Sequence, residues 1–225
     1  MLLQVILLTI GAYLLGSVPT SYIAGRLLKG IDIRDYGSGT VSGSNVWHSV
    51  ARWAVFPVGI FDILKGFVPI AIACYVLDFP IWAQGIVGLA AIAGHNWPIF
   101  LGFSGGRGIS TMMGILIVLA PWELLVFVVV WLLCIAVLRN VPLGALMAAM
   151  SLPLAGWALE GSLELTLCLL AIFLLFALKR LLANRGVPSG DWRQVMVYRL
   201  LFDRDTPGRK AWIHRTPSDM EKPAE

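Results

Sequence analysis

Two glycine-rich polar segments of this chain carry residue types that bind anions. In the segment 94–111, Gly-His-Asn-Trp-Pro is followed by Gly-Phe-Ser-Gly-Gly-Arg-Gly-Ile-Ser-Thr. Glycines let successive backbone N–H groups converge on a phosphate, and Arg107 adds a fixed positive charge. Ser110 and Thr111 are expected to cap a helix that begins at Met112, and a helix N-terminus also attracts anions. We predict an anion site here, although a Gly-Gly pair by itself also fits a flexible connector.

The second polar segment is 32–45, in which residues 37–45 hold three glycines and four hydroxyl side chains. Its glycines permit close backbone approach, while its hydroxyls and Asn45 offer hydrogen bonds and an N-cap for a helix that starts near Val46. The segment fits neither the Walker pattern nor the dinucleotide fingerprint, so nucleotide binding is unsupported. It predicts a second anion loop, with a plain surface turn as the alternative.

Asp62 and Lys65 lie three residues apart within an otherwise apolar run. Side chains at that spacing share a helix face, so the two charges can neutralise each other. Charge inside a membrane is costly, which favours an inward-facing site or a helix start near the interface. A structural ion pair that ties helices together fits the same residues.

The elements that position these residues are predicted to be membrane helices. Of the 225 residues, 58% are hydrophobic and 13% charged, and the mean hydropathy is +0.82, which excludes a soluble globular domain. A bilayer-spanning helix needs about 20 apolar residues. The apolar runs are 2–24, 54–77, 81–94, 112–121, 123–138, 142–158 and 165–178. They predict an all-α, polytopic integral membrane protein with about seven transmembrane helices, or alternatively five full spans plus re-entrant pieces.

The distribution of charge predicts the orientation in the membrane. With seven spans, all 17 Lys and Arg residues fall at or near one side, which is cytoplasmic by the positive-inside rule. Both anion loops and the C-terminus then lie in the cytoplasm, and the N-terminus lies outside. The apolar start lacks a basic leader region and is interpreted as a retained span. Cys74, Cys134 and Cys168 lie in apolar runs, where they serve as small hydrophobic residues and give no metal-binding spacing.

The chain divides into a transmembrane domain, 1–183, and a basic cytoplasmic tail, 184–225. Within the tail, Trp192 to Phe202 interleaves arginines with apolar residues, which favours a helix lying on the lipid surface. A disordered basic tail is the alternative. Nucleic-acid binding is not expected, because the sequence offers neither a known fold nor an aromatic platform for it.

Four motifs together resemble the acyl-phosphate-dependent glycerol-3-phosphate acyltransferases of bacterial membranes. These motifs occur in the family's order and spacing over about residues 8 to 183: Leu-Gly-Ser-Val-Pro at 15–19, Asp-Ile-Arg at 32–34 with Gly-Ser-Gly at 37–39 and Asn45, Asp-Ile-Leu-Lys-Gly at 62–66, and Gly-His at 94–95 through Arg-Gly at 107–108. The resemblance implies transfer of a fatty acyl group from acyl phosphate to the 1-hydroxyl of glycerol 3-phosphate. The products are lysophosphatidate and phosphate, and neither a cofactor nor a metal is implied.

The resemblance also implies roles for individual residues. Ser38, His95 and Arg107 are the expected catalytic residues. The expected substrate- and phosphate-binding residues are Arg34, Gly37, Gly39, Thr40, Gly43, Asn45, His48, Gly105, Gly106 and Gly108. The expected partners are the two substrates and the lipid bilayer, with association with other lipid-synthesis enzymes as a further hypothesis. The expected location is the bacterial cell membrane.

The chain departs from the family pattern at several positions. Thr40 replaces an asparagine, Ser-Gly-Ser at 42–44 replaces Gly-Ala-Thr, His48 stands where an arginine is usual, and Arg107 replaces a lysine. Pro142 replaces a serine, and residues 174–180 lack the histidine, arginine and asparagine of the third motif. Candidates for the missing groups are Arg139, Asn140, Lys179, Arg180 and Asn184. A catalytically inactive relative that binds phospholipid precursors or scaffolds lipid-synthesis enzymes is therefore the second hypothesis. A transporter of phosphorylated metabolites is the third.

Overall fold

The structure is a computed structural model that describes residues 1–184, 191–206, 212, 213 and 215–217. Within this part the chain is helical and contains no strand. The helices are α1 (Leu2–Gly16), α2 (Thr20–Lys29), α3 (Gly43–Ser49), α4 (Val55–Ala71), α5 (Ile81–Asn96), α6 (Ile109–Leu119), α7 (Pro121–Leu138), α8 (Val141–Glu160), α9 (Leu163–Leu182) and α10 (Trp192–Phe202). Short helical turns lie at Ile33–Asp35, Ile72–Val76 and Ile99–Leu101.

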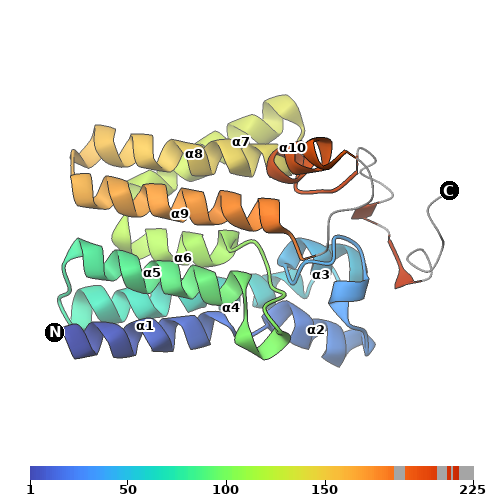
Figure 1. The fold of residues 1–225 in the computed structure, drawn as a ribbon, viewed down its shortest axis with the longest axis horizontal. Coiled ribbons are helices and arrows are strands. Elements are labelled where there is room, and N and C mark those ends of the chain that lie inside the picture. The colour runs from blue at the N-terminus through green and yellow to red at the C-terminus, as the bar shows by residue number, and fades with distance from the viewer. Residues whose placement is uncertain (185–190, 207–211, 214, 218–225) are drawn as a thin grey trace.

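Helices α1, α4 to α6, α8 and α9 run roughly along the long axis of the molecule, and α7 crosses it obliquely (Figure 1). Together these helices correspond to the seven predicted apolar runs. In the described part, five segments are long and apolar enough to cross a membrane: Leu2–Lys29, Val55–Val76, Pro121–Leu138, Val141–Glu160 and Leu163–Leu182. Helices α5 and α6 are shorter, with 16 and 11 residues. The first predicted run, 2–24, is interrupted between α1 and α2 because Pro19 lacks an N–H and disfavours helical geometry at the residue before it.

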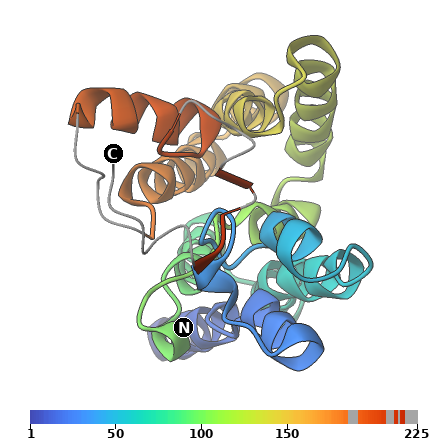
Figure 2. The same ribbon diagram turned by 90° about the vertical axis from the view of Figure 1, so that its right-hand side faces the viewer.

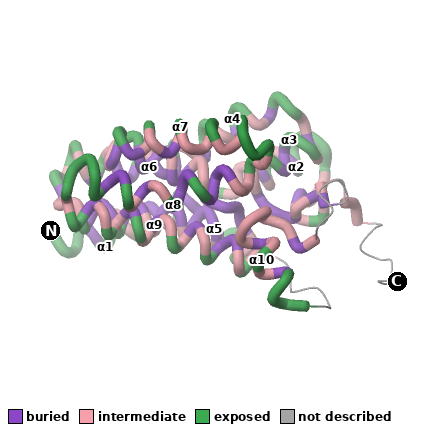
Figure 3. The backbone as a smooth tube through the Cα atoms, turned by 90° about the horizontal axis from the view of Figure 1, so that it is seen from above, coloured by how far each residue is buried: buried purple, intermediate pink, exposed green. Residues whose placement is uncertain are grey.

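The outer surface of the bundle is apolar, and exposed residues recur along the outside of its helices (Figure 3). On α7, Leu132, Leu133 and Val137 are 60%, 60% and 78% exposed. An apolar surface of this extent suits a lipid environment, and helices satisfy their own backbone hydrogen bonds there. The predicted membrane-protein class is therefore confirmed by the arrangement of the helices.

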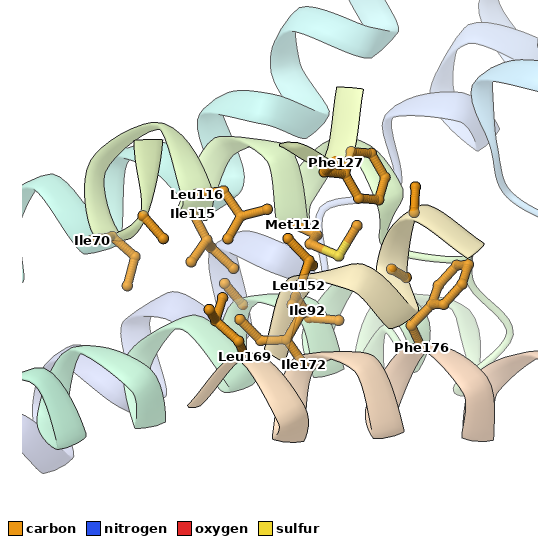
Figure 4. Packing of buried hydrophobic residues seen from close by; sticks show 14 of the residues in the cluster. Ile70, Ile92, Met112, Ile115, Leu116, Phe127, Leu152, Leu169, Ile172 and Phe176 are labelled. Atoms are coloured by element: carbon orange, nitrogen blue, oxygen red, sulfur yellow. The ribbon is translucent and has the colours of Figure 1, made fainter. Parts of the chain in front are cut away.

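The interior holds one large apolar cluster to which α4 to α9 contribute, including Ile70, Ile92, Leu152 and Ile172 (Figure 4). Glycines, which lack a side chain, let two pairs of helices approach closely. A Cβ added at Gly66 of α4 would meet the Thr111 carbonyl oxygen of α6, and α1 and α5 approach in the same way. Lipid provides no hydrophobic drive between helices, so such backbone proximity is a main source of packing energy.

The polar loops gather at the end of the bundle opposite the N-terminus (Figure 1). Helix α10 packs on α8 and α9 and runs across that end instead of along the bundle (Figure 2). The predicted helix 192–202 is confirmed, with Val195 and Arg199 buried against the bundle and Trp192 and Val197 exposed. Residues 185–190 of the predicted tail, and its last residues from 218 onward, lie outside the described part.

Candidate active site

Loop 1 (residues 30–42), which connects α2 to α3, is held in shape by Asn45. The Asn45 Nδ2 atom lies 3.0 Å from the carbonyl oxygens of Ile33, Tyr36 and Thr40, and its Oδ1 atom accepts a hydrogen bond from Ser49. The amide nitrogen thus bonds backbone carbonyls near the start, the middle and the end of loop 1. Asn45 was predicted to bind substrate, and this geometry gives it the additional task of fixing the loop.

A chain of hydroxyl groups runs along loop 1 into α3. Ser38 and Thr40 are linked at 2.7 Å, Thr40 and Ser42 at 2.8 Å, and Ser42 and Ser44 at 3.2 Å. The prediction that a helix starts near Val46 was wrong, because α3 already begins at Gly43. Ser42 takes the N-cap position in an extended conformation, and its hydroxyl joins this chain instead of capping the helix.

Loop 2 (residues 97–108), which connects α5 to α6, lies directly against His95. The Gly106 N–H donates to the His95 carbonyl at 3.0 Å, and a Cβ added at Gly106 would fall on His95 Nε2 and the Val41 carbonyl oxygen. The prediction that Ser110 and Thr111 cap a helix at Met112 was also wrong. Helix α6 begins at Ile109 because Gly108, with φ 76°, turns the chain directly into it.

A buried polar network underlies the two loops. The Lys65 ammonium lies 2.5 Å from Asp62 Oδ1 and donates to the Val18 carbonyl at 2.6 Å, while the Thr20 hydroxyl donates to the same Asp62 oxygen at 2.6 Å. His95 Nδ1 lies 3.7 Å from that oxygen. The predicted Asp62–Lys65 pair therefore exists, and it connects α4 to the break between α1 and α2 and to the imidazole.

Arg107 extends from loop 2 toward α9 and the C-terminal segment. Its Nη1 atom donates to the Lys179 carbonyl at 2.9 Å, and its Nε atom lies 2.7 Å from the Asp203 carboxylate in an ion pair. The Arg107 side chain is only 8% exposed. The guanidinium is thus held at the cavity wall, where its positive charge can meet an anion.

Asn184, at the end of α9, joins both loops. Its amide nitrogen donates to the carbonyls of Gly39 at 3.2 Å and Gly105 at 2.7 Å, and its oxygen accepts from the Lys179 ammonium at 2.9 Å. The Gly105 carbonyl also accepts from the Val41 N–H at 3.3 Å. Of the candidates for the missing third-motif groups, Asn184 has the most direct connection to both predicted anion loops.

Arg180 and Asn140 are the candidates that line the cavity, which Asn184 does not. Arg180 donates to the carbonyls of Pro142 at 2.7 Å and Leu200 at 2.8 Å, so it ties α8 and α10 to α9. Asn140 caps α8 by accepting from the Leu143 N–H at 3.1 Å. Arg139 is exposed at the end of α7 and lines no part of the cavity.

A cavity of about 480 Å³ lies between these elements. Of the predicted site residues, those that line it are Ser38, Thr40, Gly43, Asn45, His48, His95, Arg107 and Gly108. The remaining predicted residues, Arg34, Gly37, Gly39, Gly105 and Gly106, do not line it. The C-terminal segment adds wall residues that the sequence interpretation did not assign to the site: Phe202, Asp203, Arg204, Trp212 and Ile213. No motif pointed to them, because their place depends on how the segment folds back.

Arg34 has a scaffold position in loop 1. Two of its nitrogens donate to the Asp32 carboxylate at 3.0 and 2.7 Å, and a third donates to the Leu101 carbonyl in loop 2 at 3.3 Å. Hydrogen bonding from Arg34 holds the pKa of the Asp32 carboxyl below its ordinary value, and the same contact raises the pKa of Arg34. Arg34 thus stays charged and links the two loops from outside the cavity.

Comparison with known proteins relates this architecture to one family. The model of the glycerol-3-phosphate acyltransferase family matches residues 6–184. A relative named glycerol-3-phosphate acyltransferase 5, from Dehalococcoides mccartyi, is 34% identical over 99% of this chain and 98% of its own length. A glycerol-3-phosphate acyltransferase from Desulforamulus reducens is 39% identical over 66% of this chain and 74% of its own length.

Solved structures agree with the sequence relatives. A crystal structure of PlsY (YgiH), an integral membrane glycerol 3-phosphate acyltransferase, in its glycerol 3-phosphate form has a TM-score of 0.73 and 32% identity, covering 79% of this chain and 88% of that one. Its lysophosphatidic acid form gives a TM-score of 0.71 and 31% identity over the same shares. The chain is an all-helical, multi-pass membrane protein, and it belongs to the glycerol-3-phosphate acyltransferase family.

Proposed function

We propose that this protein transfers a fatty acyl group from acyl phosphate to the 1-hydroxyl of glycerol 3-phosphate, giving lysophosphatidate and phosphate in phospholipid synthesis. The observation that carries the proposal is the convergence of Ser38, His95 and Arg107 on one cavity at the polar end of a membrane bundle. Family membership and the substrate and product named for the related crystal structures support it.

The protein mainly has to align the two substrates and stabilise the developing charge, because acyl phosphate is already an activated anhydride. The glycerol 3-phosphate hydroxyl oxygen attacks the acyl carbon, an ester C–O bond forms, and the bond from the acyl carbon to the phosphate oxygen breaks. The hydroxyl proton ends on the released phosphate. In this proposal Arg107 stabilises the departing phosphate, and the Ser38 hydroxyl and its neighbours orient the reacting groups.

The walls of the cavity suit a substrate with a charged head and an apolar chain. Its lining includes Val55 and Gly59 of α4, Trp131 of α7 and Ala145 of α8 as well as Arg107 and loop 1 hydroxyls. A fatty acyl chain can therefore contact the apolar lining residues while its phosphate meets Arg107. This mixed lining supports an acylated phosphate as donor over a small soluble anion.

The proposal includes a location and an orientation. All 17 Lys and Arg residues are predicted at or near one side of the membrane, which supports a cytoplasmic active site and C-terminus with the N-terminus outside. The membrane is proposed to be the bacterial cell membrane, where the product is used for phospholipids. Association with other lipid-synthesis enzymes remains a hypothesis that pull-down from that membrane would test.

Turnover by the purified protein is the test. The protein in detergent should release phosphate from palmitoyl phosphate only when glycerol 3-phosphate is present. Arg107→Ala should lower kcat/KM by about 10²–10³-fold, and Ser38→Ala should also abolish most turnover. Arg52→Ala is the matched control, because Arg52 is exposed and does not line the cavity. Binding of glycerol 3-phosphate without turnover under any condition would favour the inactive relative instead.

A further inference from the structure

The C-terminal segment covers both predicted anion loops. Its residues Phe202, Asp203, Arg204, Trp212, Ile213 and Arg215 are here called the C-terminal cover. All but Arg215 line the cavity, and the Arg215 carbonyl contacts loop 1. Trp212 is 7% exposed. The family match ends at residue 184, so the cover is an addition to the matched region.

On loop 2, the cover neutralises Arg107. Asp203 Oδ1 lies 2.7 Å from Arg107 Nε, and the two side chains are 23% and 8% exposed. A buried guanidinium without a counter-ion is strongly disfavoured, so some anion must accompany it. In this structure that anion is the Asp203 carboxylate.

On loop 1, the cover uses a backbone donor. The Gly37 N–H donates to the Arg215 carbonyl at 2.9 Å, and a Cβ added at Gly37 would approach the Ile213 carbonyl oxygen. Gly37 has φ 52°, a left-handed conformation of the kind that turns N–H groups toward anions. The cover thus contacts one predicted anion-binding residue on each loop, with a different residue for each.

The cover has an anchor away from both contacts. Arg199 of α10 lies 2.6 Å from Asp205 and donates to the Leu181 carbonyl at 3.1 Å. Loss of the Asp203–Arg107 contact therefore leaves α10 attached to α9. Asp203 itself has φ 53° at the end of α10, a conformation that Asp and Asn tolerate better than most residues.

We infer that the C-terminal cover is an internal competitor for substrate phosphate, with Asp203 occupying Arg107 until a phosphate displaces it. The inference rests on the proposed function in taking Arg107 as the group that binds phosphate. It adds a determinant of substrate affinity outside the region matched by the family. Removal of the Asp203 charge should then strengthen phosphate binding. If Asp203 instead only orients Arg107, its removal should weaken phosphate binding.

Titration calorimetry on the full-length protein in detergent tests this competition. It measures the binding of inorganic phosphate and of glycerol 3-phosphate. Asp203→Asn should lower the Kd of at least one of the two by about three- to tenfold, as expected for loss of a partly exposed competing ion pair. Asp191→Asn is the matched control. It removes the same charge from an exposed residue of the same segment and keeps a good N-cap for α10, so its Kd should stay within twofold.

Hydrogen exchange provides an independent measurement on the wild-type protein. Saturating inorganic phosphate should raise exchange in a peptide that covers residues 203–206, while α10 itself stays held by Arg199. This increase should be absent in Asp203→Asn, where exchange starts high. If that variant folds poorly, Asp203→Gly suits the left-handed backbone and removes the same carboxylate. Unchanged or weaker binding in a folded variant, or unchanged exchange with phosphate in the wild type, would overturn the inference. Neither measurement uses turnover, so an inactive enzyme would count against the proposed function separately.

Discussion

Substitution of Asn184 by alanine should impair catalysis although Asn184 does not line the cavity. Its amide nitrogen donates to Gly39 of loop 1 and Gly105 of loop 2, at 3.2 and 2.7 Å, and its oxygen accepts from Lys179 at 2.9 Å. No other described side chain donates to backbone carbonyls of both these loop glycines. Without it, the Ser38 and Arg107 sides of the cavity lose a direct connection.

The size of the effect follows from the two bonds that the Asn184 amide nitrogen makes to the loops. Each neutral hydrogen bond contributes about 0.5–1.5 kcal/mol, so the two bonds to the loops amount to roughly 1–3 kcal/mol. If that energy holds the reacting groups in alignment, kcat/KM should fall by about 5- to 140-fold, at about 1.4 kcal/mol per tenfold. Asn184→Asp keeps the acceptor for Lys179 but directs a carboxylate at two carbonyl oxygens. It should be at least as impaired as the alanine variant.

The assay is phosphate release from palmitoyl phosphate with glycerol 3-phosphate varied, with the thermal unfolding midpoint of each variant measured alongside. A positioning role predicts that kcat falls more than KM rises, because the phosphate-binding guanidinium stays in place. Activity of Asn184→Ala within twofold of wild type, with normal unfolding, would show that Asn184 does not position the two loops for catalysis. A near-normal Asn184→Asp variant would show that only the contact with Lys179 matters.

Three further predictions concern packing and the buried network. Gly106→Ala should nearly abolish phosphate release, since its methyl group would fall on His95 Nε2; a kcat/KM within threefold of wild type would show that loop 2 can yield. Lys65→Met should destabilise by about 3–5 kcal/mol because it leaves Asp62 buried and unpaired, and the added change Asp62→Leu should recover part of the unfolding midpoint in detergent. Gly114→Val should lower that midpoint more than Gly59→Val, because a Cβ at Gly114 meets the backbone of α4 whereas Gly59 faces open space.

Helix boundaries show where local sequence patterns mislead. The segments before Val46 and Met112 contain Ser, Thr and Asn, the usual N-cap residues, yet α3 and α6 each begin three residues earlier. At α6, the left-handed Gly108 turns the chain into the helix without a side-chain cap. At α3, the hydroxyls bond to one another along loop 1. Capping propensity is only a statistical preference, and here a left-handed glycine and hydrogen bonds among the hydroxyls of the same loop outweigh it.

The class of protein, the approximate positions of seven apolar helices and the two glycine-rich loops could be predicted from the sequence, because hydrophobic run length and backbone freedom are local properties. It also identified the Asp62–Lys65 pair from spacing on one helix face. Which polar groups meet became visible only in the folded chain. Asn184 reaches Gly39 across 145 residues, and Asp203 reaches Arg107 from outside the matched family region. Such contacts depend on how α9 ends and how the chain returns across the bundle, which no spacing in the sequence records.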